Sequence, residues 1–213
     1  MLTVHEPEGP ARGALVVVHE AFGVDHWFTG ACASLAAQGW LVVAPHLFHR
    51  TGDPVVTDLA EAGPHLDALT LEGVLDDVDA AVARTAVEAH RVGIVGFSLG
   101  GNVALNAAAA RSLGAAVSFY SGGIRTSRLA LQPGIACARA LRTPWLGLFG
   151  ERDPSTPADD LDTLEAALAG SPVEAEVVRY PAGHGFLRRE TPAAVDGLGR
   201  AVAWLDAHIG PGA

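Results

Sequence analysis

The pentapeptide at residues 96–100 (GFSLG) contains the serine of this chain that is best suited to nucleophilic chemistry. It follows an apolar run at 92–97, predicted as a strand, and leads into an alanine-rich stretch at 99–111, predicted as a helix. A G-x-S-x-G sequence in this context is typical of a nucleophile elbow, whose sharp turn needs glycine because side chains there would clash. Ser98 is therefore predicted to attack an acyl carbon, and the Leu99 amide to bind the oxyanion. The alternative is a glycine-rich turn whose serine only caps the helix.

A serine hydroxyl is a weak nucleophile and requires a base that is itself oriented by an acid. In chains with this elbow the acid and then the histidine follow the serine in sequence. Asp153 comes just after a predicted strand at 145–149, and His184 comes just after another at 175–180. Both would emerge at the sheet edge where Ser98 lies. We predict the triad Ser98, His184 and Asp153. Glu151 is close enough in sequence to be the acid in place of Asp153. The alternative for His184 is that it is only a histidine on a surface loop.

The elements that must position these residues alternate between short apolar runs and longer helical patterns. Predicted strands lie at 15–18, 40–44, 92–97, 115–120, 145–149 and 175–180, and predicted helices at 27–38, 71–89, 99–111, 158–169 and 192–208. Near-continuous apolar strands between helices indicate a mostly parallel sheet covered on both faces. With the elbow, this predicts the α/β-hydrolase fold, with about six to seven strands, no large cap domain and a single domain over 1–213.

Two stretches, 49–70 and 121–143, match neither a strand nor a helix pattern. Both follow strand ends, and ligands of open α/β sheets bind at the carboxyl ends of the strands. We expect these stretches to form the walls or the lid of a pocket.

Composition excludes several classes of protein. The 213 residues suit one domain with its own core, and the formal net charge of −10 disfavours nucleic acid and anionic membranes as partners. No apolar run approaches the ~18 residues of a membrane helix, and no secretory signal is recognised, so we expect a cytoplasmic protein. Cys32 and Cys137 show neither metal nor redox spacing; buried thiols are expected, with a disulfide as the alternative.

The chain resembles the dienelactone hydrolase family along most of its length. The segments that carry the resemblance are residues 19–23 (HEAFG), 38–45 (QGWLVVAP), 96–101 (GFSLGG) and 182–186 (AGHGF). Each motif by itself is modest evidence for the family, whereas four motifs in the family's order are specific evidence for it.

By this resemblance, Glu20 corresponds to the acidic residue beside the nucleophile, and the Ala21 amide to the second oxyanion donor. A carboxylate near a nucleophile needs a hydrogen-bond partner or a raised pKa; the alternative for Glu20 is a strand-end carboxylate exposed to water. Metal binding by His19 and Glu20 is conceivable, but no second ligand pair has matching spacing. No metal or other cofactor is therefore predicted.

The sequence departs from the family pattern at two places. Well-known members carry cysteine at the nucleophile position, and a serine relies more fully on its general base. The family also holds a substrate carboxylate with two arginines. Arg188 matches the later one, although it could equally be a solvated loop residue. The earlier one has no counterpart, and Arg50 could substitute in space.

These residues predict a serine hydrolase that cleaves an ester or lactone bond of a small substrate through an acyl-enzyme. Within this class the alternative is a general carboxylesterase without preference for a carboxylate. An alternative from another class is a non-catalytic ligand-binding protein on the same fold. A monomer or a homodimer is expected.

Overall fold

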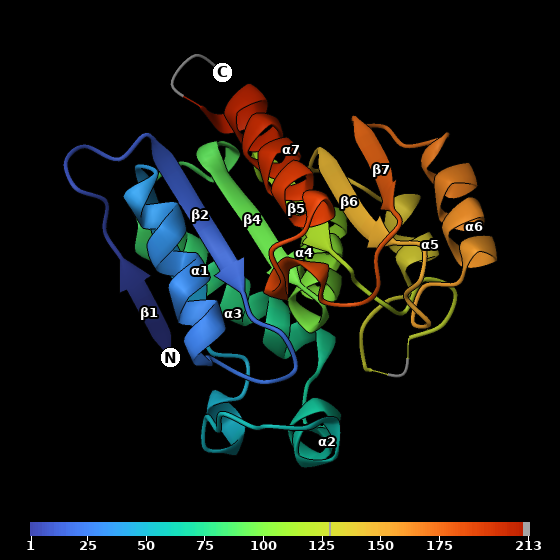
Figure 1. The fold of residues 1–213 in the computed structure, drawn as a ribbon. Coiled ribbons are helices and arrows are strands. Elements are labelled where there is room, and N and C mark those ends of the chain that lie inside the picture. Colours follow the sequence, from blue (N-terminus) through green and yellow to red (C-terminus); the bar gives the residue numbers. More distant parts are fainter. Residues whose placement is uncertain (128, 211–213) are drawn as a thin grey trace.

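A seven-stranded sheet forms the centre of the computed structural model, which describes residues 1–127 and 129–210 (Figure 1). The strands are β1 (Leu2–His5), β2 (Gly13–Val18), β3 (Trp40–Pro45), β4 (Val92–Phe97), β5 (Ala115–Phe119), β6 (Trp145–Gly150) and β7 (Ala175–Tyr180). Their order is β1-β3-β2-β4-β5-β6-β7, with β1 antiparallel to β3 and every other pair parallel. The predicted α/β-hydrolase sheet is confirmed.

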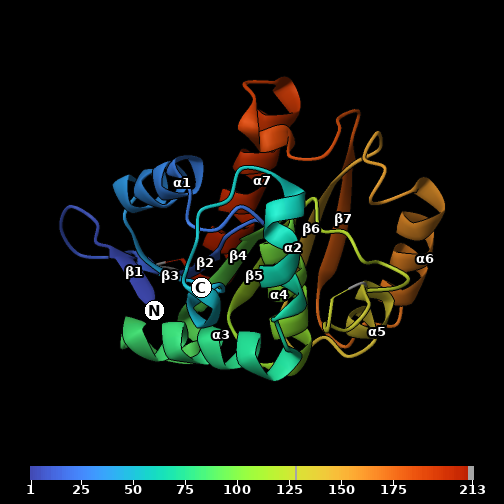
Figure 2. The ribbon, with the colours of Figure 1, turned by 90° about the horizontal axis from the view of Figure 1, so that it is seen from below.

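Helices cover both faces of the sheet, as Figure 2 shows. The helices are α1 (His26–Ala37), α2 (Leu59–Asp67), α3 (Leu71–Thr85), α4 (Leu99–Ala110), α5 (Gly134–Ala138), α6 (Ala158–Leu168) and α7 (Pro192–Ile209), with 3₁₀ turns η1 (His49–Thr51), η2 (Ala89–Arg91) and η3 (Phe186–Arg188). One face packs on α1 and α7, and the other on α3, α4, α5 and α6. This two-sided burial explains why the strands read as continuous apolar runs.

The sequence prediction missed the elements with the weakest patterns. All six predicted strands are present, but β1 was not predicted, because it has only four residues and all of them are half-buried at the sheet edge. The predicted helix 71–89 ends earlier, at Thr85, where Ala86 takes a left-handed φ of 55°. Short helices α2 and α5 occupy the two unassigned stretches, and the described residues contain no cap domain. The predicted domain limit of 213 lies outside the described residues, as does residue 128 of the second stretch.

The order of the strands brings two distant loops together. The chain passes from β2 to β3 on one side and then returns to β4 on the other side of β2. Val18 is in register with Gly96, so β2 and β4 end beside each other. Ligands bind in the crevice at such a switch point of an α/β sheet. Residues 19–23 and Ser98 therefore face the same crevice.

Both cysteines are free and buried. Burial raises the pKa of each thiol to about 12, which keeps it protonated and unreactive. The predicted buried thiols are present, and the alternative of a disulfide is not.

Candidate active site

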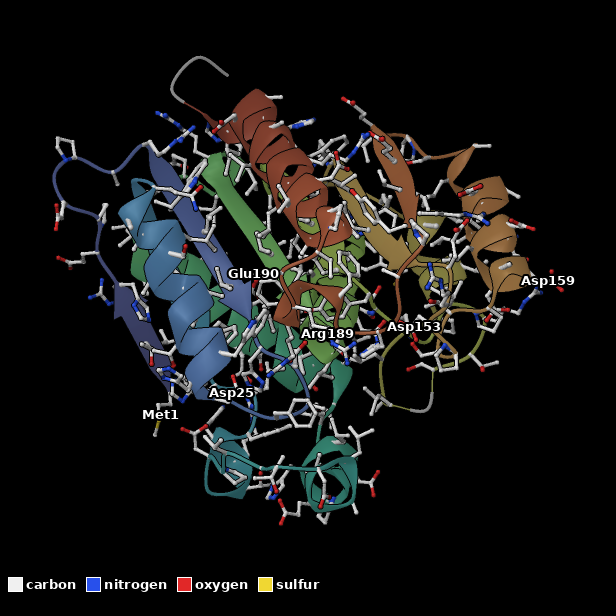
Figure 3. The ribbon with its side chains drawn as sticks, viewed as in Figure 1. Met1, Asp25, Asp153, Asp159, Arg189 and Glu190 are labelled. Atoms are coloured by element: carbon white, nitrogen blue, oxygen red, sulfur yellow. The ribbon has the colours of Figure 1, made fainter. Side chains whose placement is uncertain are left out.

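Three side chains from separate loops form a continuous hydrogen-bonded chain at the carboxyl edge of the sheet. Ser98 Oγ lies 2.9 Å from His184 Nε2, and His184 Nδ1 lies 2.6 Å from Asp153 Oδ2. Ser98 follows β4, whereas Asp153 and His184 follow β6 and β7. Figure 3 labels Asp153 at this edge of the sheet. The structure thus brings together the three residues that the sequence predicts as a triad, and Glu151 takes no part in this chain.

The turn that presents Ser98 is strained and depends on its glycines. Ser98 has φ 51° and ψ −109°, a left-handed conformation that a residue with a Cβ rarely adopts. A Cβ on Gly96 would lie 1.9 Å from the Gly100 carbonyl oxygen, and one on Gly100 would lie 2.1 Å from the Val18 carbonyl oxygen. These contacts are far below van der Waals distance. The glycines thus let the strand, the helix and the neighbouring loop converge on the serine.

Two backbone amides beside Ser98 are candidates for an oxyanion hole. The Leu99 amide opens α4, where the first amides of a helix have no partner within it. Within the described residues, the amides of Leu99 and Ala21 donate to no protein acceptor. Ala21 lines the same pocket as Ser98. These are the two donors expected from the sequence.

Asp153 is held by more partners than the sequence indicates. The residue is 2% exposed, and its Oδ1 accepts hydrogen bonds from the Ser155 amide at 2.8 Å and from the Ser155 hydroxyl at 2.6 Å. Burial by itself raises the pKa of Asp153, but the hydrogen bonds from His184 and Ser155 outweigh it and hold the pKa below its usual value. Ser155 was missed by sequence reasoning. The signal for it was an Asx turn, in which an aspartate accepts from the backbone two residues later.

Ser98 and His184 open into a cavity of about 300 Å³. Its lining consists of Glu20, Ala21, Phe22, Leu59, Ser98, His184, Gly185, Arg188 and Arg189. Leu59 comes from the unassigned stretch 49–70, whereas no described residue of 121–143 lines this cavity. A larger apolar hollow of about 780 Å³ lies between α1 and α7, but none of the three triad residues lines it. Because the nucleophile and the base face the smaller cavity, we take that cavity as the candidate site.

Glu20 and Arg188 form an ion pair in this cavity, in which the carboxylate is buried and the guanidinium is partly exposed. Glu20 is 4% exposed, and its carboxylate accepts from Arg188 Nε at 2.7 Å. Arg188 Nη2 also donates to Asp25 at 2.9 Å, and the guanidinium packs 4.7 Å from the Trp27 ring centroid and 5.2 Å from that of Phe22. Burial lowers the pKa of Arg188, but the bonds to both carboxylates outweigh burial and raise it. Glu20 is thus not the water-exposed carboxylate of the alternative interpretation, nor is Arg188 a freely solvated cation.

Replacement of Arg188 by Met is expected to lower the free energy of unfolding by about 2 kcal/mol, because it leaves the Glu20 carboxylate buried without its cation. The partial exposure of the arginine keeps this value below that of a fully buried pair. Urea denaturation measures the change. Arg189→Met is the matched control, and Glu20→Gln added to Arg188→Met should recover part of the loss. Equal stability of the Arg188 and Arg189 variants would contradict this account.

Arg50 is not brought to this cavity. Its guanidinium donates to both carboxylate oxygens of Asp77 on α3, at 2.6 and 3.0 Å, and to the Gly73 carbonyl at 3.2 Å. It does not line the cavity that contains Ser98. The sequence analysis offered Arg50 as a possible second substrate-binding arginine. In the structure Arg50 forms an ion pair with Asp77 instead.

His19 supports the loop that carries Glu20 and Ala21. It is fully buried; Nδ1 donates to the Glu20 carbonyl at 2.6 Å, and Nε2 accepts from the Leu47 amide at 3.0 Å. Both ring nitrogens are therefore used by the backbone, which leaves neither to bind the metal that the sequence made conceivable. The ring is neutral, because burial lowers the pKa of His19 to about 4.

The buried neutral His19 predicts a loss of stability in acid. The pKa of His19 is about 4 in the folded protein and about 6.5 in the unfolded chain, so the unfolded chain binds more protons between these pH values. The contribution of His19 to the free energy of unfolding is therefore complete above pH 6.5 and is lost as the pH falls toward 4. The expected loss is about 3 kcal/mol. Unfolding in urea between pH 4 and 7 measures it. His19→Gln should flatten this dependence, whereas His90→Gln, at an exposed position, should not; identical slopes for both variants would refute the assignment.

The fold and the site define a class of protein. A mostly parallel sheet with a serine on the strained turn between β4 and α4, followed in sequence by an acid and a histidine, is the arrangement of the α/β-hydrolases.

Comparisons with known proteins narrow this class. The sequence profile of the Dienelactone hydrolase family matches residues 2–209. The chain is 35% identical over 215 residues to the Salmonella typhimurium protein named "Putative carboxymethylenebutenolidase", covering 94% of this chain and 79% of the relative. It is 30% identical over 205 residues to the carboxymethylenebutenolidase of Rhodococcus opacus, covering 92% of this chain and 81% of the relative. The crystal structure of the "Putative Dienelactone Hydrolase" of Klebsiella pneumoniae superposes with a TM-score of 0.83 at 30% identity, covering 96% of this chain and 98% of that one.

The chain belongs to the dienelactone hydrolase family. It is a hydrolase that acts on ester bonds, of which a lactone is the cyclic form. The family predicted from the sequence is thereby confirmed. None of the helices in the described part of the chain combines the length and the apolar character that a membrane span requires.

Proposed function

We propose that this protein is a serine hydrolase that cleaves an ester or lactone of a small substrate through an acyl-enzyme. The observation that carries the proposal is the hydrogen-bonded chain from Ser98 through His184 to Asp153. An intact chain of this kind argues against a non-catalytic ligand-binding protein, because ligand binding does not require a base aligned on a serine.

The proposed reaction has two steps. His184 Nε2 takes the proton of Ser98 as Oγ attacks the carbonyl carbon, and Asp153 stabilises the imidazolium through Nδ1. The amides of Leu99 and Ala21 donate to the oxyanion, and the imidazolium then protonates the leaving alkoxide. In the second step a water molecule, deprotonated by His184, releases the acid and restores Ser98.

The cavity supports a small substrate. A volume of about 300 Å³ lies at the lower end of the range for small-molecule sites. The name carboxymethylenebutenolidase, carried by the Rhodococcus opacus relative, denotes hydrolysis of a lactone that bears a carboxylate, and Arg188 and Arg189 both line the cavity of this chain. An anionic lactone is therefore the first substrate class to test.

A second candidate is a general carboxylesterase without preference for a carboxylate. The observation that favours it is the pairing of Arg188 with both Glu20 and Asp25, which leaves this arginine little charge for a substrate. Relative kcat/KM for a lactone acid and its methyl ester separates the candidates. A preference for the acid that is lost in Arg188→Met supports the lactone hydrolase, and equal rates support the esterase.

The shared mechanism is tested by a fluorophosphonate probe, which reacts with an activated serine. Mass spectrometry is expected to locate the adduct on Ser98, together with turnover of small nitrophenyl esters. Saturable binding of a lactone without labelling and without turnover would overturn the proposal in favour of a ligand-binding protein.

A further inference from the structure

His19 is hydrogen-bonded at both ring nitrogens, and one of these bonds reaches the loop beside the nucleophile. Nδ1 lies 2.6 Å from the Glu20 carbonyl oxygen, and Nε2 lies 3.0 Å from the Leu47 amide nitrogen. Because the Leu47 amide can only donate, Nε2 is the acceptor and the ring proton is on Nδ1. The tautomer is thereby fixed, and His19 donates to the Glu20 carbonyl.

The Glu20 carbonyl and the Ala21 amide belong to the same peptide group. The described residues contain no cis peptide bond, so this group is trans and its C=O and N–H point in opposite directions. The carbonyl accepts from His19 Nδ1 and also from the Gly23 amide, at 3.3 Å. A peptide group whose carbonyl is fixed in this way has a fixed N–H as well. In the proposed reaction that N–H is the second oxyanion donor.

Packing holds the imidazole in this orientation. The His19 ring is fully buried and meets the rings of Phe28 and Phe48 edge to face, with the centroids 5.9 and 5.2 Å apart. Leu47, whose amide binds the other ring nitrogen, is 1% exposed and lies in the loop after β3. The ring thus connects the loop after β2 with the loop after β3, and a rotation of the ring would break both hydrogen bonds.

We propose that His19 is a positioning residue of the hydrolase, which orients the peptide group of Glu20 and Ala21 so that its N–H points at the oxyanion. The inference rests on the proposed function. The Ala21 amide donates to no acceptor among the described residues, and Ala21 lines the cavity that contains Ser98. A donor that is oriented in advance stabilises the oxyanion most, because nothing has to reorganise as the charge develops. The hydrogen bond from His19 also polarises the peptide group, which strengthens its N–H as a donor.

Two substitutions of His19 separate its two hydrogen bonds. An asparagine amide takes about the position of Nδ1 and a glutamine amide that of Nε2, so His19→Asn keeps the donor to Glu20 and His19→Gln keeps the acceptor for Leu47. We expect kcat to fall about 10- to 100-fold in His19→Gln with KM little changed, because only the transition state loses an interaction. His19→Asn should recover most of this kcat. Full kcat in His19→Gln, or equal losses in both variants, would overturn the inference.

A matched variant separates loss of stability from loss of orientation. Both His19 variants are expected to lower the urea midpoint, since each leaves one buried backbone group without its partner. Leu164→Ala, at a fully buried position of α6 outside the cavity, should also lower the midpoint but keep kcat. A loss of kcat in Leu164→Ala as large as that in His19→Gln would show that reduced stability alone slows the reaction, and would overturn the inference.

A transition-state analogue measures the oxyanion interaction directly. Ser98 Oγ adds to the carbonyl carbon of a trifluoromethyl ketone, His184 takes the serine proton, and the ketone oxygen becomes an oxyanion like the one formed during turnover. The inhibition constant is expected to rise in His19→Gln by the same factor by which kcat/KM falls. An unchanged inhibition constant would overturn the inference.

A measurement on the wild-type protein does not require a His19 variant to fold. ¹⁵N NMR of the imidazoles is expected to show the Nδ1–H tautomer of His19, and the signal of this proton should shift when the trifluoromethyl ketone binds. The opposite tautomer, or an unchanged signal, would overturn the inference. Failure of the proposed function looks different, because the wild-type protein would then neither turn over esters nor react at Ser98 with a fluorophosphonate.

Discussion

Ser98→Ala is expected to lower kcat/KM for small esters by a factor of about 10⁴ to 10⁶. The oxyanion donors and the cavity remain in this variant, which is why some rate above that of water should persist. The nucleophile is lost, however, and His184 Nε2 loses the hydroxyl that lies 2.9 Å away. Alanine keeps the Cβ of serine, so the strained φ of 51° is not made worse and the fold should be preserved.

The measurement combines steady-state rates with labelling by a fluorophosphonate. Ser98→Ala should lose both the turnover and the label, whereas Ser171→Ala, in a turn far along the chain, should keep both. Near-parental turnover in Ser98→Ala would show that the nucleophile is another group. An unchanged urea midpoint confirms that the loss is chemical and not a loss of fold.

The residues of the proposed triad could be found from the sequence because each follows a strong local pattern. Ser98, Asp153 and His184 each come after a predicted apolar strand, and parallel strands place their carboxyl ends at one edge of the sheet. The same patterns define six of the seven strands. The edge strand β1 was not predicted, because half-buried residues at a sheet edge show little periodicity in hydrophobicity.

The partners of the charged residues could not be found in this way. Arg188 contacts Glu20 and Asp25, which lie 168 and 163 positions away in sequence, and no local pattern relates them. Asp25 is the N-cap of α1, where its Oδ1 accepts from the Phe28 amide at 2.8 Å. Its other oxygen binds Arg188, a second use that only the three-dimensional arrangement shows.

Hydrogen bonding likewise separates residues that look alike in the sequence. Tyr120 and Tyr180 each come at the end of a strand, yet the Tyr180 hydroxyl donates to Asp196, whereas the Tyr120 hydroxyl has no hydrogen-bond partner among the described residues. Strand periodicity determines which face a residue points to, but not what lies opposite it.

Asp153→Asn is expected to lower kcat by about 10⁴-fold with little change in KM. The carboxylate accepts from His184 Nδ1 at 2.6 Å, which keeps the proton on Nδ1 and leaves Nε2 free to take the proton of Ser98. An asparagine that turns its NH₂ toward Nδ1 favours the opposite tautomer, whose Nε2 carries a proton and cannot act as a base. The amide also cannot stabilise the imidazolium.

Glu151→Gln is the matched control for this prediction, because Glu151 is the acid that competes with Asp153 in the sequence. It is exposed and outside the hydrogen-bonded chain, so its replacement should leave kcat unchanged. Since the pKa of Asp153 is held below its usual value, the carboxylate stays ionised at mildly acidic pH, and the acid limb of the wild-type rate should not arise from Asp153. Loss of activity in Glu151→Gln with retention in Asp153→Asn would reverse the assignment of the acid, and with it the tautomer that the mechanism requires.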